Sequence, residues 1–325
     1  MITYRYNQAA DLYAGEEESY DSKILKILKN HFPSDWKLVK DAPTIDIIFG
    51  KPAKPYSYEP SIRIRAGHLA GKSRLLLTEK GEFYKRFQEY SWIPPTEIVT
   101  IDTVPAFRTL RILKPTQSWH GSGNQVVENA KQAREWIASQ PAYSTWALQK
   151  YIRPSLFQSR KFHLRIYALV ICDVRQIKHI WLSNRHLLVS AKQMYTESDF
   201  GNTDIHDTHY STEFTYTYPD VLPDGWDEKD AKRVNKKLQS IVRTIFEEEP
   251  HIHSDWRVTH SFEVFGIDVL FDESKKPFIL EINRKTLLRK SKIIPFYPSF
   301  LQHGIGDFVG VDMLKGTPDT MEQIL

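Results

Sequence analysis

The chain has 325 residues, of which 41% are apolar and 13% aromatic, so it is long enough for two or three subdomains around a packed core. It contains no uncharged apolar run of about 18 residues and no apolar segment near its N-terminus, which argues against a membrane-spanning helix and a secretion signal. The net charge of +4 is too small to indicate a nucleic-acid-binding protein, and the single cysteine, Cys172, excludes an internal disulfide. We therefore expect a cytoplasmic protein that binds neither nucleic acid nor a membrane.

The first third of the chain predicts two helices and two strands. Apolar side chains recur at helical spacing over residues 21–32, and short apolar runs at 36–39 and 45–49 indicate strands. After a proline-rich loop, a second helix is predicted over 78–90. Between residues 51 and 89 there are nine Lys or Arg against four Glu, which suits an acidic partner, although a solvated surface is the simpler interpretation.

The rest of the chain predicts strands alternating with helices, which is typical of an α+β fold with antiparallel strands. The expected strands cover residues 97–101, 109–113, 146–151, 162–172 and 178–191. Helices are expected over 126–138 and 228–246, where apolar residues recur at helical spacing. A polar, aromatic loop region is expected over 197–223.

Two apolar segments near the end of the chain carry acids and predict a β-hairpin. Residues 262–272 contain Asp268, and residues 277–283 contain Glu281 and Asn283 after a polar turn. Glu281 and Asn283 are two apart and share one face of their strand. Three oxygen-bearing side chains in a mostly buried setting are suited to Mg²⁺. The alternative is that Asp268 and Glu281 are each paired with a nearby Lys or Arg.

A lysine at the end of a predicted strand, followed by glycines, indicates phosphate binding. Lys114 and Pro115 precede a loop that contains Gly121 and Gly123. The lysine supplies a charge, and the glycines let backbone N–H groups approach phosphate oxygens. The order differs from that of a Walker motif, and a turn with a solvent-exposed lysine is the alternative interpretation.

Two further segments would complete a nucleotide site. Strand backbone over Lys150–Ile152 could face the edge of an adenine, with Gln149 adding an amide partner. Lys161 and Arg165 are four apart on a predicted strand, so both lie on one face and can reach phosphate. An exposed strand face is the alternative for these two bases.

Taken in order, these motifs resemble the tubulin tyrosine ligase and ligase-like family of ATP-grasp enzymes. They are Lys-Pro-(loop)-Gly-x-Gly, Gln-Lys-Tyr-Ile-x-Pro, Arg-Lys-Phe-x-Leu-Arg, Phe-Glu-x-Phe-Gly-x-Asp and Glu-x-Asn, between Lys114 and Asn283. The resemblance implies an α+β ATP-grasp fold, with antiparallel sheets, flanking helices and the nucleotide held between the central and C-terminal subdomains. We expect an N-terminal subdomain over 1–70, a central one over 71–151 and a C-terminal one over 152–325.

The resemblance also implies roles for the matching residues. ATP contacts are implied for Lys114, Gly121, Gly123, Gln149, Lys150, Tyr151, Ile152, Lys161 and Arg165. Mg²⁺ ligands are implied at Asp268, Glu281 and Asn283, and catalytic roles at Arg165, Lys161 and Glu281. Acceptor contacts are expected at His206 and Thr208 and, from the basic tract, at Lys72 and Arg74.

The chain departs from the family pattern on the acceptor side. His163 stands where the family usually has aspartate, His209 replaces an asparagine, and Arg284 follows Glu-x-Asn where the family has small residues. An arginine of the family falls on Val189 or Ser190. These changes leave the implied ATP and metal residues in place and alter acceptor recognition.

The resemblance implies an ATP- and Mg²⁺-dependent ligase that joins a carboxylate to an amine through an acylphosphate. Three hypotheses remain: a ligase that adds a free amino acid to an acidic protein tail such as that of tubulin, a ligase that makes a small peptide or metabolite, and a non-catalytic relative that binds a protein partner. The acidic hairpin argues against the third, because an inactive protein has no physical reason to bury three polar groups. The basic tract over 51–86 favours the first. The amino acid, the acceptor, the number of additions and the oligomeric state stay open.

Overall fold

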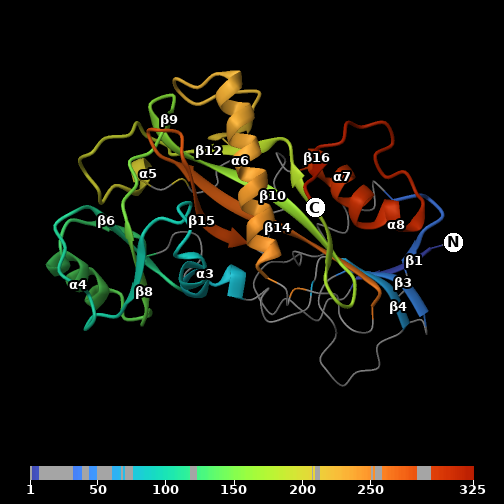
Figure 1. The fold of residues 1–325 in the computed structure, drawn as a ribbon, viewed down its shortest axis with the longest axis horizontal. Coiled ribbons are helices and arrows are strands. Elements are labelled where there is room, and N and C mark those ends of the chain that lie inside the picture. Colours follow the sequence, from blue (N-terminus) through green and yellow to red (C-terminus); the bar gives the residue numbers. More distant parts are fainter. Residues whose placement is uncertain are drawn as a thin grey trace.

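The computed structural model describes residues 2–6, 32–38, 44–49, 61–66, 69, 76–117, 123–206, 208, 213–249, 252, 258–283 and 294–325. These residues form an elongated α+β molecule (Figure 1). Its strands are β1 (Thr3–Tyr6), β2 (Lys37–Leu38), β3 (Thr44–Phe49), β4 (Ser61–Ala66), β5 (Thr96–Val99), β6 (Arg111–Pro115), β7 (Gln125–Val127), β8 (Trp146–Lys150), β9 (Leu156–Phe157), β10 (Arg160–Cys172), β11 (Ile177–Ser183), β12 (His186–Ser190), β13 (Thr215–Tyr218), β14 (His260–Phe271), β15 (Pro277–Asn283) and β16 (Met321–Gln323). Its helices are α3 (Lys80–Phe87), α4 (Ala130–Ser139), α5 (Thr203–His206), α6 (Glu228–Glu247), η2 (Ile294–Phe296), α7 (Tyr297–Leu301), η3 (Gln302–Gly306) and α8 (Asp307–Val309).

Most strands of the described residues belong to one large sheet. Its order is β13-β12-β10-β14-β4-β3-β1-β2, with β9 and β11 also paired to β10, β15 to β14, and β16 to β11. β10, β14 and β15 pair antiparallel, as expected, whereas β1, β3 and β4 run parallel to their neighbours, and β4 also runs parallel to β14. The expectation of antiparallel sheets is therefore wrong for the N-terminal strands, because an apolar pattern indicates a strand but not the direction of its partner.

The long strand β10 separates two hydrophobic cores. Its even-numbered residues from Phe162 to Cys172 face a core that includes the buried side of α6, while Tyr167 and Leu169 face a second core beside α7. This division follows from the alternation of side chains along a strand. Figure 1 shows α6 crossing β10 and β14. No helix in the described regions is long and apolar enough to cross a membrane.

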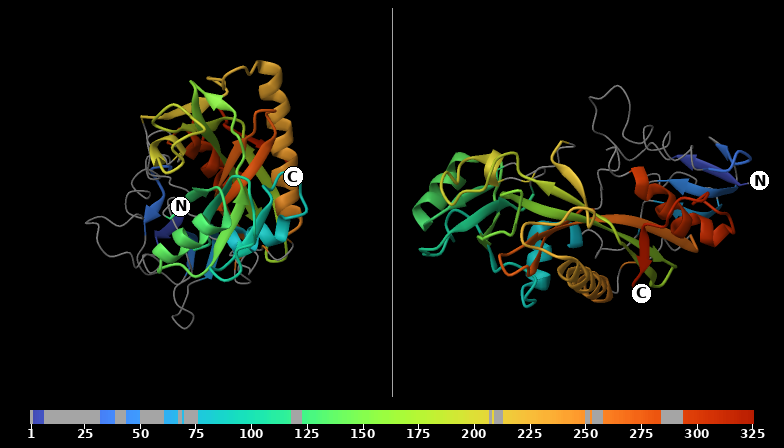
Figure 2. Two further views of the ribbon diagram at one scale, coloured as in Figure 1. Left: turned by 90° about the vertical axis from the view of Figure 1, so that its left-hand side faces the viewer. Right: turned by 90° about the horizontal axis from the view of Figure 1, so that it is seen from above.

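A second sheet of the described residues has the order β5-β8-β6-β7. It lies with α4 at one end of the molecule, and β1, β3 and β4 lie at the other end (Figure 2). Leu113, Leu148 and Trp146 are fully buried between this sheet and α4, where they pack against Ala133 and Ile137. The packing holds β6 and β8, which carry several of the predicted nucleotide residues.

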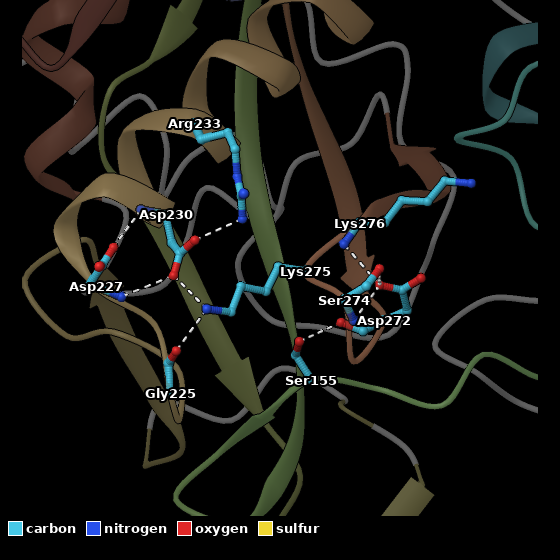
Figure 3. A network of polar contacts seen from close by, with 9 residues as sticks. All are labelled: Ser155, Gly225, Asp227, Asp230, Arg233, Asp272, Ser274, Lys275 and Lys276. Atoms are coloured by element: carbon cyan, nitrogen blue, oxygen red, sulfur yellow. Dashed lines mark hydrogen bonds and ion pairs between the residues drawn. The ribbon is translucent and has the colours of Figure 1, made fainter.

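The turn of the β14–β15 hairpin is fixed to the start of α6 (Figure 3). The Lys275 ammonium donates to Asp230 Oδ2 at 2.5 Å and to the Gly225 carbonyl at 2.8 Å. Within the turn, the Asp272 carboxylate accepts from the Ser274 N–H at 2.9 Å. These contacts hold in place the two strands that carry the predicted acids.

Four predicted elements differ from the structure. The loop region expected over 197–223 contains the helix α5 and the strand β13, which pairs with β12. The single strand expected over 178–191 is two strands, β11 and β12, separated by a two-residue bend at Asn184 and Arg185. The helix expected over 126–138 begins only at Ala130, because the residues before it pair as β7 and the Asn129 side chain caps the helix at the Gln132 N–H. The helix expected over 21–32 lies, apart from Phe32, outside the described residues.

Candidate active site

Side chains from three neighbouring strands meet on one face of the large sheet. Arg165 on β10 is directly opposite Asp268 on β14, and Asp268 is directly opposite Glu281 on β15. Lys161 lies four residues before Arg165 on β10 and therefore on the same side of the strand. This face is opposite the one that α6 covers, because Phe162 and Leu164, which alternate with Lys161, His163 and Arg165 on β10, belong to the core under α6.

Asp268 is held by two basic side chains. Arg165 Nη2 donates to Asp268 Oδ2 at 2.8 Å and Arg165 Nε donates to Oδ1, while His163 Nε2 lies 3.5 Å from Oδ1. Burial alone would lower the pKa of Arg165, but the adjacent carboxylate raises it, so the guanidinium stays charged. The pairing of Asp268 with a base, which the sequence left as an alternative, therefore exists, and it lies inside the site because all three side chains are buried.

Glu281 is the second carboxylate on this face. Its Oε2 lies 3.3 Å from Lys80 Nζ, and its Oε1 accepts from Asn283 Nδ2 at 3.0 Å. Burial would raise the pKa of Glu281, but Lys80, Asn283 and Arg165 together lower it to about 2, so the group is ionised at neutral pH. Its side chain is 29% exposed, against 9% for Asp268, so Glu281 is the more accessible carboxylate.

The second sheet contributes Lys114 from β6. The buried ammonium donates to Gln149 Oε1 at 2.8 Å, and Gln149 Nε2 donates to Thr96 Oγ1 at 2.8 Å. Burial lowers the pKa of Lys114 to about 7; Glu281 opposes this shift and the neighbouring Lys161 adds to it. The site therefore lies where the two sheets meet, with Lys114 from one sheet and both carboxylates from the other.

Aromatic side chains surround Tyr151, where the chain leaves the second sheet. The Tyr151 hydroxyl lies 3.2 Å from His206 Nδ1. The ring centroid of Phe200 lies 5.8 Å from that of Tyr151, and the centroid of Tyr195 lies 5.8 Å from that of His206. Lys161 Nζ lies 5.4 Å from the centroid of the Tyr151 ring and donates to the His206 carbonyl at 2.9 Å. Burial, together with the charge of Lys161, lowers the pKa of His206 and keeps its imidazole neutral at physiological pH.

Among the described residues, the backbone N–H groups of residues 150–152 do not all have a hydrogen-bond acceptor. The N–H groups of Lys150 and Tyr151 donate to the Pro95 and Leu110 carbonyls, at 2.8 Å and 3.1 Å. The N–H of Ile152 has no hydrogen-bond acceptor within the described parts of the chain.

The two acceptor residues predicted at the end of α5 and just after it, His206 and Thr208, lie beside this site. Thr208 Oγ1 is 2.6 Å from His163 Nδ1, so His163 connects that loop to Asp268. His206 lies against Tyr151. In the sequence, His163 is only a departure from the family pattern; in the structure, it links the loop after α5 to Asp268.

Of the two predicted loop glycines, the structure describes Gly123. Gly123 follows β6 with φ +81°, and a Cβ there would lie 2.8 Å from Pro115 Cγ, so the loop requires a glycine at this position. Gly121, Lys72 and Arg74 lie outside the described residues. Residues 284–292, which contain five bases and no acid, also lie outside the described residues.

Lys80 is a site residue that the sequence analysis does not identify. It begins α3, whose Tyr84 hydroxyl donates to the Leu280 carbonyl of β15 at 2.5 Å. Just after the helix, the Trp92 carbonyl accepts from the Ile279 N–H at 2.9 Å, so this segment runs along the outer edge of β15. Lys80 and Tyr84 are four apart on a predicted helix, but no pattern reveals that the helix contacts a strand 196 residues later.

The amino-acid sequence is similar to those of known proteins. The sequence model described as the tubulin-tyrosine ligase family matches residues 25–291. The chain belongs to the tubulin-tyrosine ligase family. The resemblance inferred from the sequence motifs is therefore confirmed.

Curated relatives of this tubulin-tyrosine ligase family member include three proteins named as glutamylases. They are the tubulin polyglutamylase ttll-4 of Caenorhabditis briggsae, 26% identical over 248 residues, the tubulin monoglutamylase TTLL4 of Homo sapiens, 27% identical over 236 residues, and the probable tubulin polyglutamylase ttll-9 of Caenorhabditis elegans, 24% identical over 226 residues. The matches cover 67%, 63% and 63% of this chain, but only 40%, 19% and 53% of those relatives.

Membership of the tubulin-tyrosine ligase family implies an ATP-grasp fold and the general use of ATP and Mg²⁺. The described residues contain no group of three or more His, Cys, Asp or Glu side chains arranged to hold a metal ion. Two carboxylates and the amide of Asn283 do converge, however, and oxygen ligands of this kind fit Mg²⁺, which usually completes its shell with water and phosphate oxygens.

Proposed function

We propose that the chain is an ATP-dependent ligase that adds an amino acid to an acidic protein acceptor. One observation supports this proposal most: cationic and acidic side chains from both sheets and from α3 converge at the same place. The cations are Lys80, Lys114, Lys161 and Arg165, and the oxygen-bearing groups are Asp268, Glu281 and Asn283.

The proposed reaction has two steps. A carboxylate oxygen of one substrate bonds to the γ-phosphorus of ATP, and ADP leaves with the electrons of the broken bond. The amine nitrogen of the other substrate then bonds to the acyl carbon and loses a proton, and inorganic phosphate leaves. Phosphoryl transfer needs positioning and charge neutralisation more than covalent catalysis, and Lys114, Lys161 and Arg165 can supply both.

The acidic residues would hold Mg²⁺. When bound, the ion would neutralise phosphate charge and polarise the γ-phosphoryl group. Glu281 is ionised and partly exposed, so it would be the principal ligand. Asp268 would share its oxygens with Arg165, and Asn283 would add its amide oxygen.

The backbone on either side of Tyr151 would hold the adenine. An adenine edge presents a ring nitrogen that accepts a hydrogen bond next to an amino group that donates one. The N–H of Ile152, which has no acceptor within the described residues, would supply the donor for that ring nitrogen. The buried ring of Tyr151 would pack against the base.

The names of the relatives support an acidic tail as acceptor and glutamate as the amino acid. Glutamate would supply the amine, and a side-chain or terminal carboxylate of the tail would be activated. Tubulin is the acceptor we propose to test first, consistent with the expected cytoplasmic location.

The test is a direct assay of ligation. The chain would be incubated with ATP, Mg²⁺, pooled amino acids including glutamate, glycine and tyrosine, and either tubulin or no protein, and the products weighed by mass spectrometry. We expect tubulin to gain the mass of one or more glutamate residues, and we expect Lys114→Ala and Glu281→Gln to abolish the gain. ATP turnover with new small amides and unmodified tubulin would instead support a metabolite ligase. A parent protein that neither hydrolyses ATP nor shows a higher melting temperature with Mg-ATP would contradict the proposal.

A further inference from the structure

The outer side of α6 carries a group of bases that the proposed site does not use. Lys229, Lys232, Arg233, Lys236 and Lys237 are all exposed and lie in the first half of the helix. At 3.6 residues per turn, these positions are neighbours at i, i+3 and i+4 spacing on the side away from the core. We call these five residues the α6 basic stripe; α6 itself lies at the surface in front of β10 and β14 (Figure 1).

The charge of the α6 basic stripe is largely unneutralised by the fold. Arg233 pairs with Asp230 at 2.7 Å, but within the described residues none of the four lysines has an acidic partner. The second half of the same helix is different, because Arg243 pairs with Glu247 four residues later at 2.7 Å. Positive and negative side chains are therefore paired in the second half of α6, whereas the first half keeps an excess of positive charge.

The stripe also places like charges beside one another. Lys229 lies three and four residues from Lys232 and Arg233, and Lys236 lies four and three residues from the same two bases. Such pairs repel and weaken a helix, whereas alternating signs would strengthen it. Helix stability alone does not account for this pattern, and an external negative partner would convert the repulsion into attraction. We propose that the α6 basic stripe docks an acidic polypeptide segment.

The location of the stripe indicates which part of a partner it would hold. α6 covers the face of the sheet opposite Lys161 and Arg165, so the stripe cannot contact the reacting phosphates. It would bind a second acidic segment of the same acceptor and raise the local concentration of the segment being modified. The identity of the partner as an acidic acceptor rests on the proposed function. The stripe consists of Lys and Arg alone, and it has no aromatic side chain on which the bases of a nucleic acid could stack.

The experiment compares two charge reversals of equal size. Lys232→Glu with Lys236→Glu changes the stripe, and Lys131→Glu with Lys178→Glu makes the same change of net charge on α4 and β11. Binding of a fluorescent poly-glutamate chain would be measured by anisotropy at low and high salt. We expect the parent and the control variant to bind alike and more weakly at high salt, and the stripe variant to bind about tenfold more weakly. The stripe variant should keep its melting temperature, because the new acids relieve the repulsion along the helix.

A second measurement separates this proposal from the proposed function. In the ligation assay, the stripe variant should raise the KM for the intact protein acceptor while leaving kcat and the turnover of a short acidic peptide unchanged. Equal poly-glutamate affinity of the stripe and control variants would overturn the docking proposal, as would binding of RNA or anionic vesicles in preference to poly-glutamate. A parent protein that binds poly-glutamate through the stripe but lacks ligase activity would refute the proposed function and leave the docking surface intact.

Discussion

At the scale of single residues, the site is a set of charges that depend on one another. Arg165 and Asp268 are both buried, and each satisfies the charge of the other. Glu281 and Lys80 form a second pair of opposite charges, and Glu281 also raises the pKa of Lys114 across the junction of the sheets. Removing one partner of such a pair leaves an uncompensated charge, and this makes the pairs testable by stability as well as by activity.

The pair Arg165 and Asp268 gives the first prediction. Arg165→Met strands a buried carboxylate, so we expect the free energy of unfolding to fall by about 3–5 kcal/mol in urea denaturation. Adding Asp268→Leu removes the stranded charge and should recover most of that loss. Arg185→Met, which breaks an exposed pair with Asp220, should cost less than about 1 kcal/mol. A double variant that is no more stable than Arg165→Met would show that the two residues are not energetically coupled.

Lys114 gives a prediction about pH. Burial lowers the pKa of Lys114 from 10.5 to about 7, so the free protein begins to lose this proton near pH 7. A bound phosphate would raise the pKa again, so the complex keeps the proton. Above pH 7, binding therefore requires the uptake of a proton. Affinity for Mg-ATP should be full below pH 7 and fall as the pH rises through it. The free energy of unfolding depends on pH in the opposite direction. Between pH 7 and 10.5 the unfolded chain holds this proton and the folded chain has lost it. The contribution of Lys114 to the free energy of unfolding therefore rises over this range.

Calorimetric titration with Mg-ATP across this range measures the effect on affinity. Lys114→Arg keeps its charge at every pH tested, so its affinity should be flat where that of the parent falls. A parallel decline in both proteins would assign the pH dependence to another group.

At the scale of elements, the sequence predicts individual helices and strands well but does not predict which distant elements contact one another. The periodicity that predicted α6 agrees with the observed helix to within one residue, and the acidic hairpin has the predicted strands and turn. Lys80 was missed because its role depends on a contact between α3 and β15. Such contacts arise from tertiary packing, and the local spacing of side chains does not record them.

The hairpin turn allows a test at this scale. Lys275 joins the β14–β15 turn to the start of α6 through Asp230 and the Gly225 carbonyl. Lys275→Ala removes both contacts, so we expect the free energy of unfolding to fall by about 1–3 kcal/mol. Lys276→Ala, at the neighbouring position, is the control and should change stability little. Equal losses in the two variants would mean that the turn is not anchored through Lys275.

At the scale of the whole molecule, the candidate site depends on side chains from two different sheets. The motifs placed its residues on the correct strands, and only the folded chain shows that Lys114 and Glu281 come from different sheets. A nucleotide bound between them would connect the two. We expect Mg-ATP to slow hydrogen exchange in β6 and β8 and also in β14 and β15, measured by mass spectrometry of peptides from each sheet. Protection confined to one sheet would place the nucleotide elsewhere.

The contact of α3 with β15 has a consequence for solubility. β15 is paired on one side with β14, and its other side is occupied by the Trp92 carbonyl and the Tyr84 hydroxyl. Without that cover, residues 278–282 of β15, four of which are apolar, would present free backbone groups to other chains. Intermolecular β-sheets grow from such exposed edges. Substitutions that loosen α3 should therefore promote aggregation of the folded protein, and the segment that supplies Lys80 to the site also keeps separate copies of the chain apart.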